Sequence, residues 1–304
     1  MLVRSVDSTI RLRDGRSLAY REHGDLSGQP VFFLHGNPGS RLMRHPDETI
    51  ADSLGVRMIA TDRPGFGRSD PHPGRTLRST AADLCDLADA LAIDRFDVIG
   101  VSAGGPHALA AAHALASRVR AVAVVSGVGP LDREADFEGM HSEFRAAFRA
   151  IEKMPDWLVR SITWVRTRRA LRNPGRAVAE TAATLSEDDQ RILARPEIRD
   201  QVATFRGEAT RQGVGAVIEE ARVLMAPWGF RPEDIGAPVD LWYWAEDRIV
   251  PPQMGRRLAA RMPSAVPRFL PGGGHFMIYD AWRPIIEALG VTRTQGRPTV
   301  SKEE

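Results

Sequence analysis

The chain carries two hydrophobic patterns in turn. Short apolar runs rich in β-branched residues predict buried strands, and apolar residues three and four apart predict helices. An early hairpin is centred on the turn pair Asp14-Gly15. Because strands and helices then alternate, we expect a parallel sheet covered on both faces. The predicted strands of this half are Thr9–Arg13, Ser17–His23, Pro30–Leu34, Val56–Thr61, Phe96–Val101 and Val119–Val125, and the helices are Leu42–Leu54, Leu77–Leu91 and Ala103–Ala116.

The alternation stops near Gly129, and the chain to about Gly229 has only helical patterns. Residues three and four apart form one apolar stripe there: Phe137, His141, Phe144, Phe148 and Ile151. Further helices are predicted at Trp157–Leu171, after a capping box at Ser186–Asp189, at Glu197–Arg211 and at Ala216–Met225. The alternation then resumes with strands Val239–Ala245 and Val266–Leu270 and helices Met254–Met262 and Met277–Leu289.

These patterns predict an α/β protein with a mostly parallel, eight-stranded sheet. Residues 1–129 and 230–290 would form the α/β core, and residues 130–229 an all-helical lid inserted after the sixth strand. The lid would lie over the carboxyl ends of the strands. Residues 291–304 are polar and without periodicity, so we expect a disordered tail.

Composition narrows the class of protein. A chain of 304 residues, 43% hydrophobic, can bury a large core, and a net charge of +2 gives no strong field to attract nucleic acid. The single cysteine, Cys85, excludes an intramolecular disulfide and makes a structural zinc site unfavourable. Neither a signal-peptide pattern nor an apolar run of membrane-spanning length is present. We therefore expect a cytoplasmic monomer or homodimer that acts on a small molecule, with no membrane or nucleic-acid partner, no metal and no cofactor.

The run Gly100-Val101-Ser102-Ala103-Gly104 joins a predicted strand to a predicted helix. A serine on such a sharp turn is exposed as a nucleophile beside the free N–H groups of the new helix. Two other interpretations are a serine that only caps the helix and a glycine loop for a dinucleotide. A dinucleotide loop normally follows the first strand of its unit, and an acid ends the next strand. Here several strands come earlier, and the next one ends in Ser126-Gly127.

Catalytic groups in open α/β sheets gather where the strands end. The polar residues at these positions are Asn37, Asp62, Ser102, Asp247 and His275. A serine nucleophile needs an imidazole base and a buried carboxylate that orients this base. Ser102, Asp247 and His275 supply these groups in the order Ser, Asp, His. Glu246 and Asp240 compete with Asp247 for the role of the acid, but Asp240 lies inside its strand rather than at its end.

Five motifs occur in order along residues 10–290: HGNPG, DRPGFGRSD, GVSAGG, AEDRIVP and GGGHF. With these motifs the chain resembles an α/β-hydrolase fold enzyme with a helical cap. The resemblance implies that Ser102 is the nucleophile, His275 the general base and acid, and Asp247 its orienting partner. It also implies an oxyanion hole formed by the backbone N–H groups of Asn37 and Ala103.

The function that we expect is hydrolysis of a carboxylic ester or related acyl compound through an acyl-enzyme. The aromatic and histidine side chains that we expect near the substrate are Phe137, His141, Phe144 and Phe276. Dehalogenases and epoxide hydrolases of the family have Asp in place of Ser102. Several alternatives stay open: a prolyl-iminopeptidase-like enzyme, a perhydrolase, a carbon–carbon bond hydrolase, and a lyase, cyclase or ligand-binding protein on the same fold.

Overall fold

A computed structural model of the 304-residue chain describes residues 5–131 and 133–290. In these residues, eight strands form one sheet in the order β1-β2-β4-β3-β5-β6-β7-β8. The first two strands are antiparallel to each other, β2 is antiparallel to β4, and all other neighbours are parallel. The mostly parallel eight-stranded sheet predicted from the sequence is therefore confirmed. The strands are β1 (Val6–Arg11), β2 (Ser17–Gly24), β3 (Gln29–Leu34), β4 (Val56–Thr61), β5 (Phe96–Val101), β6 (Val119–Val125), β7 (Val239–Trp244) and β8 (Ala265–Leu270).

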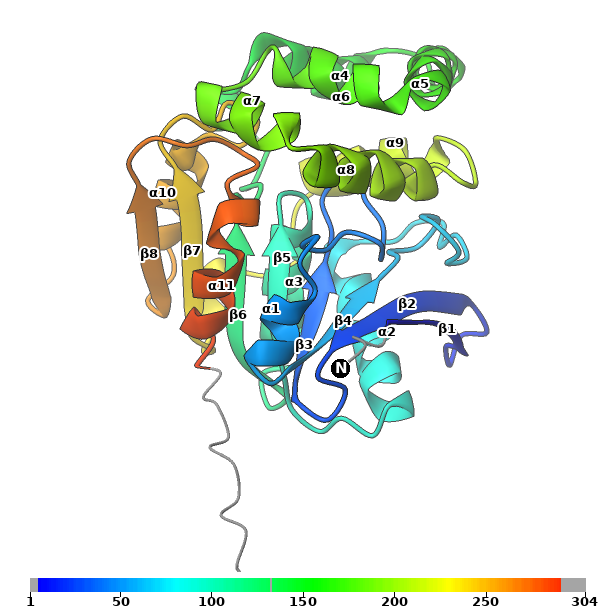
Figure 1. The fold of residues 1–304 in the computed structure, drawn as a ribbon. Coiled ribbons are helices and arrows are strands. Elements are labelled where there is room, and N and C mark those ends of the chain that lie inside the picture. Colours follow the sequence, from blue (N-terminus) through cyan, green and yellow to red (C-terminus); the bar gives the residue numbers. More distant parts are fainter. Residues whose placement is uncertain (1–4, 132, 291–304) are drawn as a thin grey trace, which may run out of the picture.

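Helices cover both faces of the sheet (Figure 1). One face packs against α1 (Thr49–Ser53) and α11 (Ile278–Ala288), and the other against α2 (Leu77–Ala90), α3 (Gly104–Ala114) and α10 (Pro252–Ala259). Strands β5 and β7 are buried along their whole length. This explains why their sequences are mostly apolar rather than alternating, with Asp97 and Asp240 as the charged exceptions.

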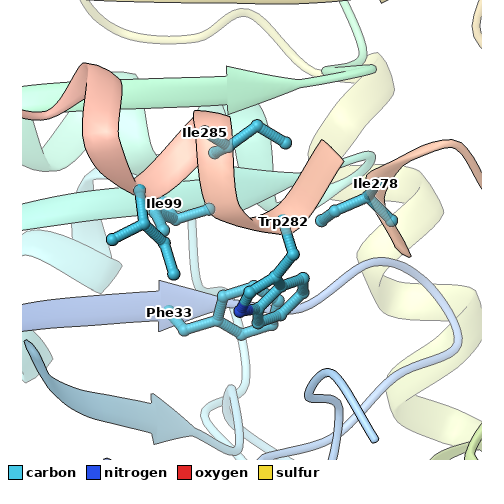
Figure 2. Close-up of a pocket in the computed structure, with 6 residues that line it drawn as sticks. Phe33, Ile99, Ile278, Trp282 and Ile285 are labelled. Carbon is cyan, nitrogen blue, oxygen red and sulfur yellow. The ribbon is translucent and has the colours of Figure 1, made fainter. Parts of the chain in front are cut away.

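The face under α11 is a close-packed core (Figure 2). Phe33 of β3 and Ile99 of β5 meet Ile278, Trp282 and Ile285 of α11, and the rings of Phe33 and Trp282 lie 5.4 Å apart. The gap between these side chains has about 0 Å³ for a water molecule. It is therefore part of the dry core, and a binding site has to be sought at the strand ends.

The chain between β6 and β7 is helical, as its patterning predicts. Figure 1 shows its helices lying beyond the arrowheads of the central strands. The role of this segment as a lid, and the domain boundaries at 130 and 229, remain predictions. We call residues 130–229 the helical insertion. Its elements are η1 (Glu134–Phe137), α4 (Ser142–Lys153), α5 (Asp156–Arg172), α6 (Pro174–Ala182), α7 (Glu187–Ala194), α8 (Pro196–Ala209) and α9 (Gly215–Met225), and η2 (Pro232–Asp234) follows it.

Three local predictions were wrong, and one helix was missed. The helix predicted for Leu42–Leu54 is only α1, since Pro46 disfavours helical backbone in the residue before it. Strands β1 and β2 do form a hairpin, but their loop is longer than the two-residue turn that Asp14-Gly15 indicates. The loop is closed by the hydrogen bond from Leu12 N–H to Arg16 O at 2.8 Å. Phe137 lies in η1, so the apolar stripe is not one helix, and α6 was not predicted at all. The tail predicted for 291–304 lies outside the described residues.

Candidate active site

Ser102 lies on the turn between β5 and α3, as its motif predicts. Its φ is +55°, a left-handed conformation that few residues other than glycine adopt. Backbone bonds hold it there: Ser102 N–H donates to Val125 O at 2.9 Å, and Ser102 O accepts from the N–H groups of Gly105 and Val128 at 3.0 and 3.1 Å. The side chain remains half-buried rather than fully enclosed. The turn therefore presents a hydroxyl at the carboxyl end of the sheet.

The glycines of the motif let the backbone segments approach closely. A Cβ on Gly104 would lie 2.1 Å from Leu34 O, and one on Gly100 would lie 2.4 Å from Gly104 O. Both distances are far below van der Waals contact. Only glycine therefore allows α3 to start this close to β3 and β5.

Asp247 and His275 are brought together although they are 28 residues apart. Asp247 Oδ2 lies 2.8 Å from His275 Nδ1. The other oxygen, Oδ1, accepts the N–H groups of Ile249 and Val250, each at 2.9 Å. Because Asp247 is fixed by these bonds and its side chain is excluded from solvent, it can orient the imidazole and stabilise its charged form. Glu246 is exposed, and Asp240 pairs with Arg268 instead.

The environment of His275 favours the protonated imidazole. Burial alone lowers the pKa of His275, but the charge of Asp247 and its hydrogen bond outweigh burial and raise this pKa above 6.5. Asp189 adds a smaller effect in the same direction. Such a histidine binds a proton more readily than an ordinary one, as a general base must. In the described residues, no hydrogen bond joins the Ser102 hydroxyl to His275.

The loop of Asn37 lies next to Ser102. A Cβ built on Gly36 would be 3.3 Å from the Ser102 Cβ, so the two segments are in contact. Asn37 Nδ2 donates to Val217 O of α9 at 3.0 Å. Ala103, the first residue after Ser102, is buried at the start of α3. The role of the Asn37 and Ala103 backbone N–H groups as an oxyanion hole stays a prediction.

The residues predicted near the substrate differ in exposure. Phe137 is buried, and its ring packs 5.8 Å from that of Phe148. Phe276 is buried beside His275, with ring centroids 5.8 Å apart. His141 caps α4, and Phe144 lies one turn further on; both are half-buried. Only these two keep appreciable surface for a ligand.

A buried ion cluster supports the Asn37 loop, and the sequence analysis missed it. Arg63 donates to the carbonyl groups of His35 and Gly36, the second at 3.2 Å. Glu220 of α9 lies 3.1 Å from Arg63, 2.7 Å from Arg75 and 2.8 Å from His107 Nε2. The sequence did contain a signal for this cluster: Glu220 is an acid on the apolar side of the helix predicted at Ala216–Met225.

Asp189 was also missed as a site residue, because Ser186–Asp189 was assigned only to a capping box. Ser186 does accept the N–H of Asp189 at 3.2 Å. The Asp189 carboxylate, however, accepts the backbone N–H groups of His275 and Phe276 at 2.9 and 2.7 Å. A residue of the helical insertion thus contacts the loop that carries the candidate base.

The part of the chain that the structure describes offers neither a metal site nor a membrane span. The described residues contain no group of three or more metal-binding side chains close enough to hold an ion. None of the described helices is long and apolar enough to cross a bilayer.

A comparison with known protein families identifies the family to which this chain belongs. The sequence model of the alpha/beta hydrolase fold matches residues 29–281. A solved alpha/beta hydrolase fold protein from Nakamurella multipartita superposes with a TM-score of 0.70 at 20% identity, over 96% of this chain and all of that one. At this identity the likeness concerns the fold alone.

Curated proteins related in sequence include two haloperoxidases and a hydrolase. A non-heme chloroperoxidase from Streptomyces lividans is 37% identical over 150 residues, which is 47% of this chain and 54% of that protein. A putative non-heme bromoperoxidase from Mycobacterium tuberculosis is 26% identical, over 87% of this chain and 92% of that protein. A 2-hydroxy-6-oxononadienedioate/2-hydroxy-6-oxononatrienedioate hydrolase from Paraburkholderia xenovorans is 26% identical, over 91% of each chain.

Proposed function

Because this chain belongs to the alpha/beta hydrolase fold family, we propose that it is a serine hydrolase that cleaves a carboxylic ester or a related acyl compound. Ser102 is the nucleophile, His275 the general base and acid, and Asp247 the carboxylate that orients His275. The observation that carries the proposal is the 2.8 Å contact between Asp247 and His275 at the same sheet end as the strained Ser102 turn. An imidazole fixed in this way is the activating group that a serine needs.

The reaction proceeds in two halves. His275 Nε2 takes the hydroxyl proton while Ser102 Oγ attacks the ester carbonyl, and the N–H groups of Asn37 and Ala103 hold the oxyanion. The intermediate collapses, the carbon–oxygen bond to the alcohol breaks, and His275 gives its proton to the alcohol. Water then attacks the acyl-enzyme in the same manner, and the acid and free Ser102 are released.

The substrate contacts are part of the same proposal. His141 and Phe144 keep surface at the edge of the helical insertion and are assigned to contact with the acyl or leaving group. Phe137 and Phe276 are buried and shape the wall behind them.

One relative favours a second candidate. The Paraburkholderia xenovorans hydrolase is named for 2-hydroxy-6-oxo dicarboxylates, and the match extends over 91% of each chain. The second candidate is therefore hydrolysis of a carbon–carbon bond next to a ketone, with the same three side chains.

A labelling experiment tests the proposal. A fluorophosphonate probe is expected to label the purified protein, and Ser102→Ala is expected to abolish the label. Ser126→Ala is the matched control, because Ser126 also has positive φ and directly follows the neighbouring strand β6. Equal labelling of Ser102→Ala and the unchanged protein would refute the assignment. A panel of p-nitrophenyl esters and a 2-hydroxy-6-oxo dienoic acid then separates the two candidates.

A further inference from the structure

In the described residues, the core holds the backbone of the loop between β8 and α11 only at its first two glycines: Ala245 N–H donates to Gly272 O at 3.2 Å, and Glu246 N–H donates to Gly273 O at 2.9 Å. The loop contains three consecutive glycines, and Gly272 and Gly273 have φ values of +67° and +69°. Glycine is the most flexible residue, so this loop has many alternative conformations available. His275 follows the glycines directly. Whatever fixes this loop therefore also fixes the imidazole.

The loop is held by two carboxylates from the first turn of α7. Asp188 Oδ2 accepts the N–H of Gly273 at 2.9 Å. Asp189 accepts two neighbouring N–H groups, His275 at Oδ2 and Phe276 at Oδ1, at 2.9 and 2.7 Å. Each oxygen of Asp189 is thus matched to one donor. Hydrogen bonds to an ionised acceptor are about twice as strong as neutral ones.

The close approach of α7 depends on Gly274. A Cβ at this position would lie 2.0 Å from Asp189 Oδ2 and 2.4 Å from Ser186 Oγ. Gly274 lies between Gly273, which is bonded to Asp188, and His275, which is bonded to Asp189, and its missing side chain lets the Asp189 carboxylate reach the backbone. Helix capping alone does not need a glycine at position 274. Gly274 therefore serves the contact between α7 and the loop of His275.

The carboxylate is itself buried, with 1% of the residue exposed. Burial raises the pKa of Asp189, whereas the N–H bonds from Phe276 and His275 and the charge of His275 lower it, and the net effect is a rise. The other ionisable groups that face it are Asp247 and His275. A buried carboxylate is costly unless its bonds are satisfied, so its bonds to this loop are a main reason that it is tolerated.

We propose that Asp189 is a positioning residue through which the helical insertion fixes the catalytic imidazole of His275. This inference rests on the proposed role of His275 as general base. Asp189 does not touch the substrate; it holds the two backbone N–H groups on either side of the His275 α-carbon, while Asp247 holds the ring. Asp247 of the core thus orients the imidazole through Nδ1, and Asp189 of the helical insertion fixes the main chain of His275.

The main test compares Asp189→Asn with the unchanged protein. The amide can accept only one of the two N–H bonds, and its NH₂ group faces the other donor. We expect kcat for a hydrolysed p-nitrophenyl ester to fall about 100-fold, the effect of a small misplacement of a catalytic group. KM is expected to stay within about threefold. The acid limb of the kcat/KM profile is expected to move to lower pH, because a negative charge near His275 is lost.

The matched control is Asp200→Asn on the neighbouring helix α8. Asp200 is exposed, with 77% of its side chain accessible, and lies 3.8 Å from Arg199. Its kinetics are expected to be unchanged. Asp189→Glu tests rescue, because it keeps the carboxylate on a longer side chain. A kcat higher than that of Asp189→Asn would support positioning through the charge and the hydrogen bonds of this residue. If Asp189→Asn folds and keeps both kcat and the pH profile, the inference is wrong.

A second measurement needs neither a variant nor a substrate. In the unchanged protein, the NMR shifts of the His275 and Phe276 amide protons are expected to change together at one pH, which lies above the usual pKa of an aspartate, as Asp189 titrates. Independent titration of these two amides, or none, would overturn the inference. Absence of fluorophosphonate labelling at Ser102 with coupled amide shifts would instead refute the proposed function while supporting the contact with Asp189.

Discussion

The Glu220 carboxylate of α9 lies 3.1 Å from the Arg63 guanidinium, and both side chains are at most 1% exposed. Burial would raise the pKa of Glu220, but Arg63, Arg75 and His107 hold it well below its usual range. Glu220 is therefore a buried anion between two buried cations. Arg63 in turn donates to the backbone of the loop before Asn37. The helical insertion is thereby tied to the core by a charge cluster.

Glu220→Gln is expected to lower the free energy of unfolding by about 3–5 kcal/mol, because Arg63 and Arg75 would stay buried without a counter-charge. Urea unfolding measures the change. Arg222→Gln on the same helix is the control, since Arg222 pairs with Asp156 at the surface. Exposed pairs contribute about 0–1 kcal/mol. A Glu220→Gln protein as stable as the control would show that the cluster does not support the fold.

Asp247→Asn is expected to lower kcat of the proposed reaction by about 10⁴-fold, because the amide holds His275 in the wrong tautomer. Steady-state hydrolysis of a p-nitrophenyl ester measures the loss. Glu246→Gln is the control one residue away, with an exposed side chain. Loss of activity in the control but not in Asp247→Asn would assign the acid to Glu246.

The pH dependence of kcat/KM follows from the environment of His275. Burial opposes the charged imidazole, but Asp247 raises the pKa of His275 above 6.5. A general base acts only when it is neutral. Activity is therefore expected to rise with pH and to level off above a midpoint that lies higher than 6.5. A profile that is flat down to pH 5.5 would contradict His275 as the base.

His23 makes stability depend on pH. It is 2% exposed, and burial together with Arg44 and Arg21 lowers its pKa to about 3. In the unfolded chain the group takes up a proton near pH 6.5. Between pH 3 and pH 6.5 the unfolded state therefore binds more protons than the folded state. The free energy of unfolding falls by about 1.4 kcal/mol for each pH unit as the pH is lowered through this range. The contribution is fully present above pH 6.5.

His23→Leu removes the pH-dependent contribution of His23 to the free energy of unfolding. The loss of unfolding free energy between pH 7.5 and 5.5 is expected to be about 1.4 kcal/mol smaller in the variant. Urea unfolding at the two pH values gives both numbers. The same pH dependence in both proteins would mean that His23 is protonated or exposed in the folded state.

Local patterns were enough to predict the sheet and the positions of the proposed catalytic side chains. Strands such as Phe96–Val101 are short apolar runs with sharp ends. Ser102 directly follows β5, and Asp247 and His275 lie in the loops that follow β7 and β8. Parallel strands present their carboxyl ends at one edge, so residues at those ends meet whatever their separation in the chain. The Asp247–His275 contact is an example.

Contacts across the helical insertion could not be predicted in the same way. Asp189 has the sequence of a capping residue, and its real partners are 86 and 87 residues away. Glu220 meets Arg63 only because α9 packs over the Asn37 loop. A single sequence gives the type of such a side chain but not the distant segment that it meets. For the same reason, the burial of Phe137 in η1 was not predicted from its spacing.

The two anchors of the helical insertion bear on the engineering of this protein. Asp189 of α7 is bonded to the loop of His275, and Glu220 of α9 is bonded, through Arg63, to the loop of Asn37. Residues 130–229 are therefore not an exchangeable module. A chimera that takes this segment from a relative would lose these contacts to both loops unless it keeps an acid at each of these two positions.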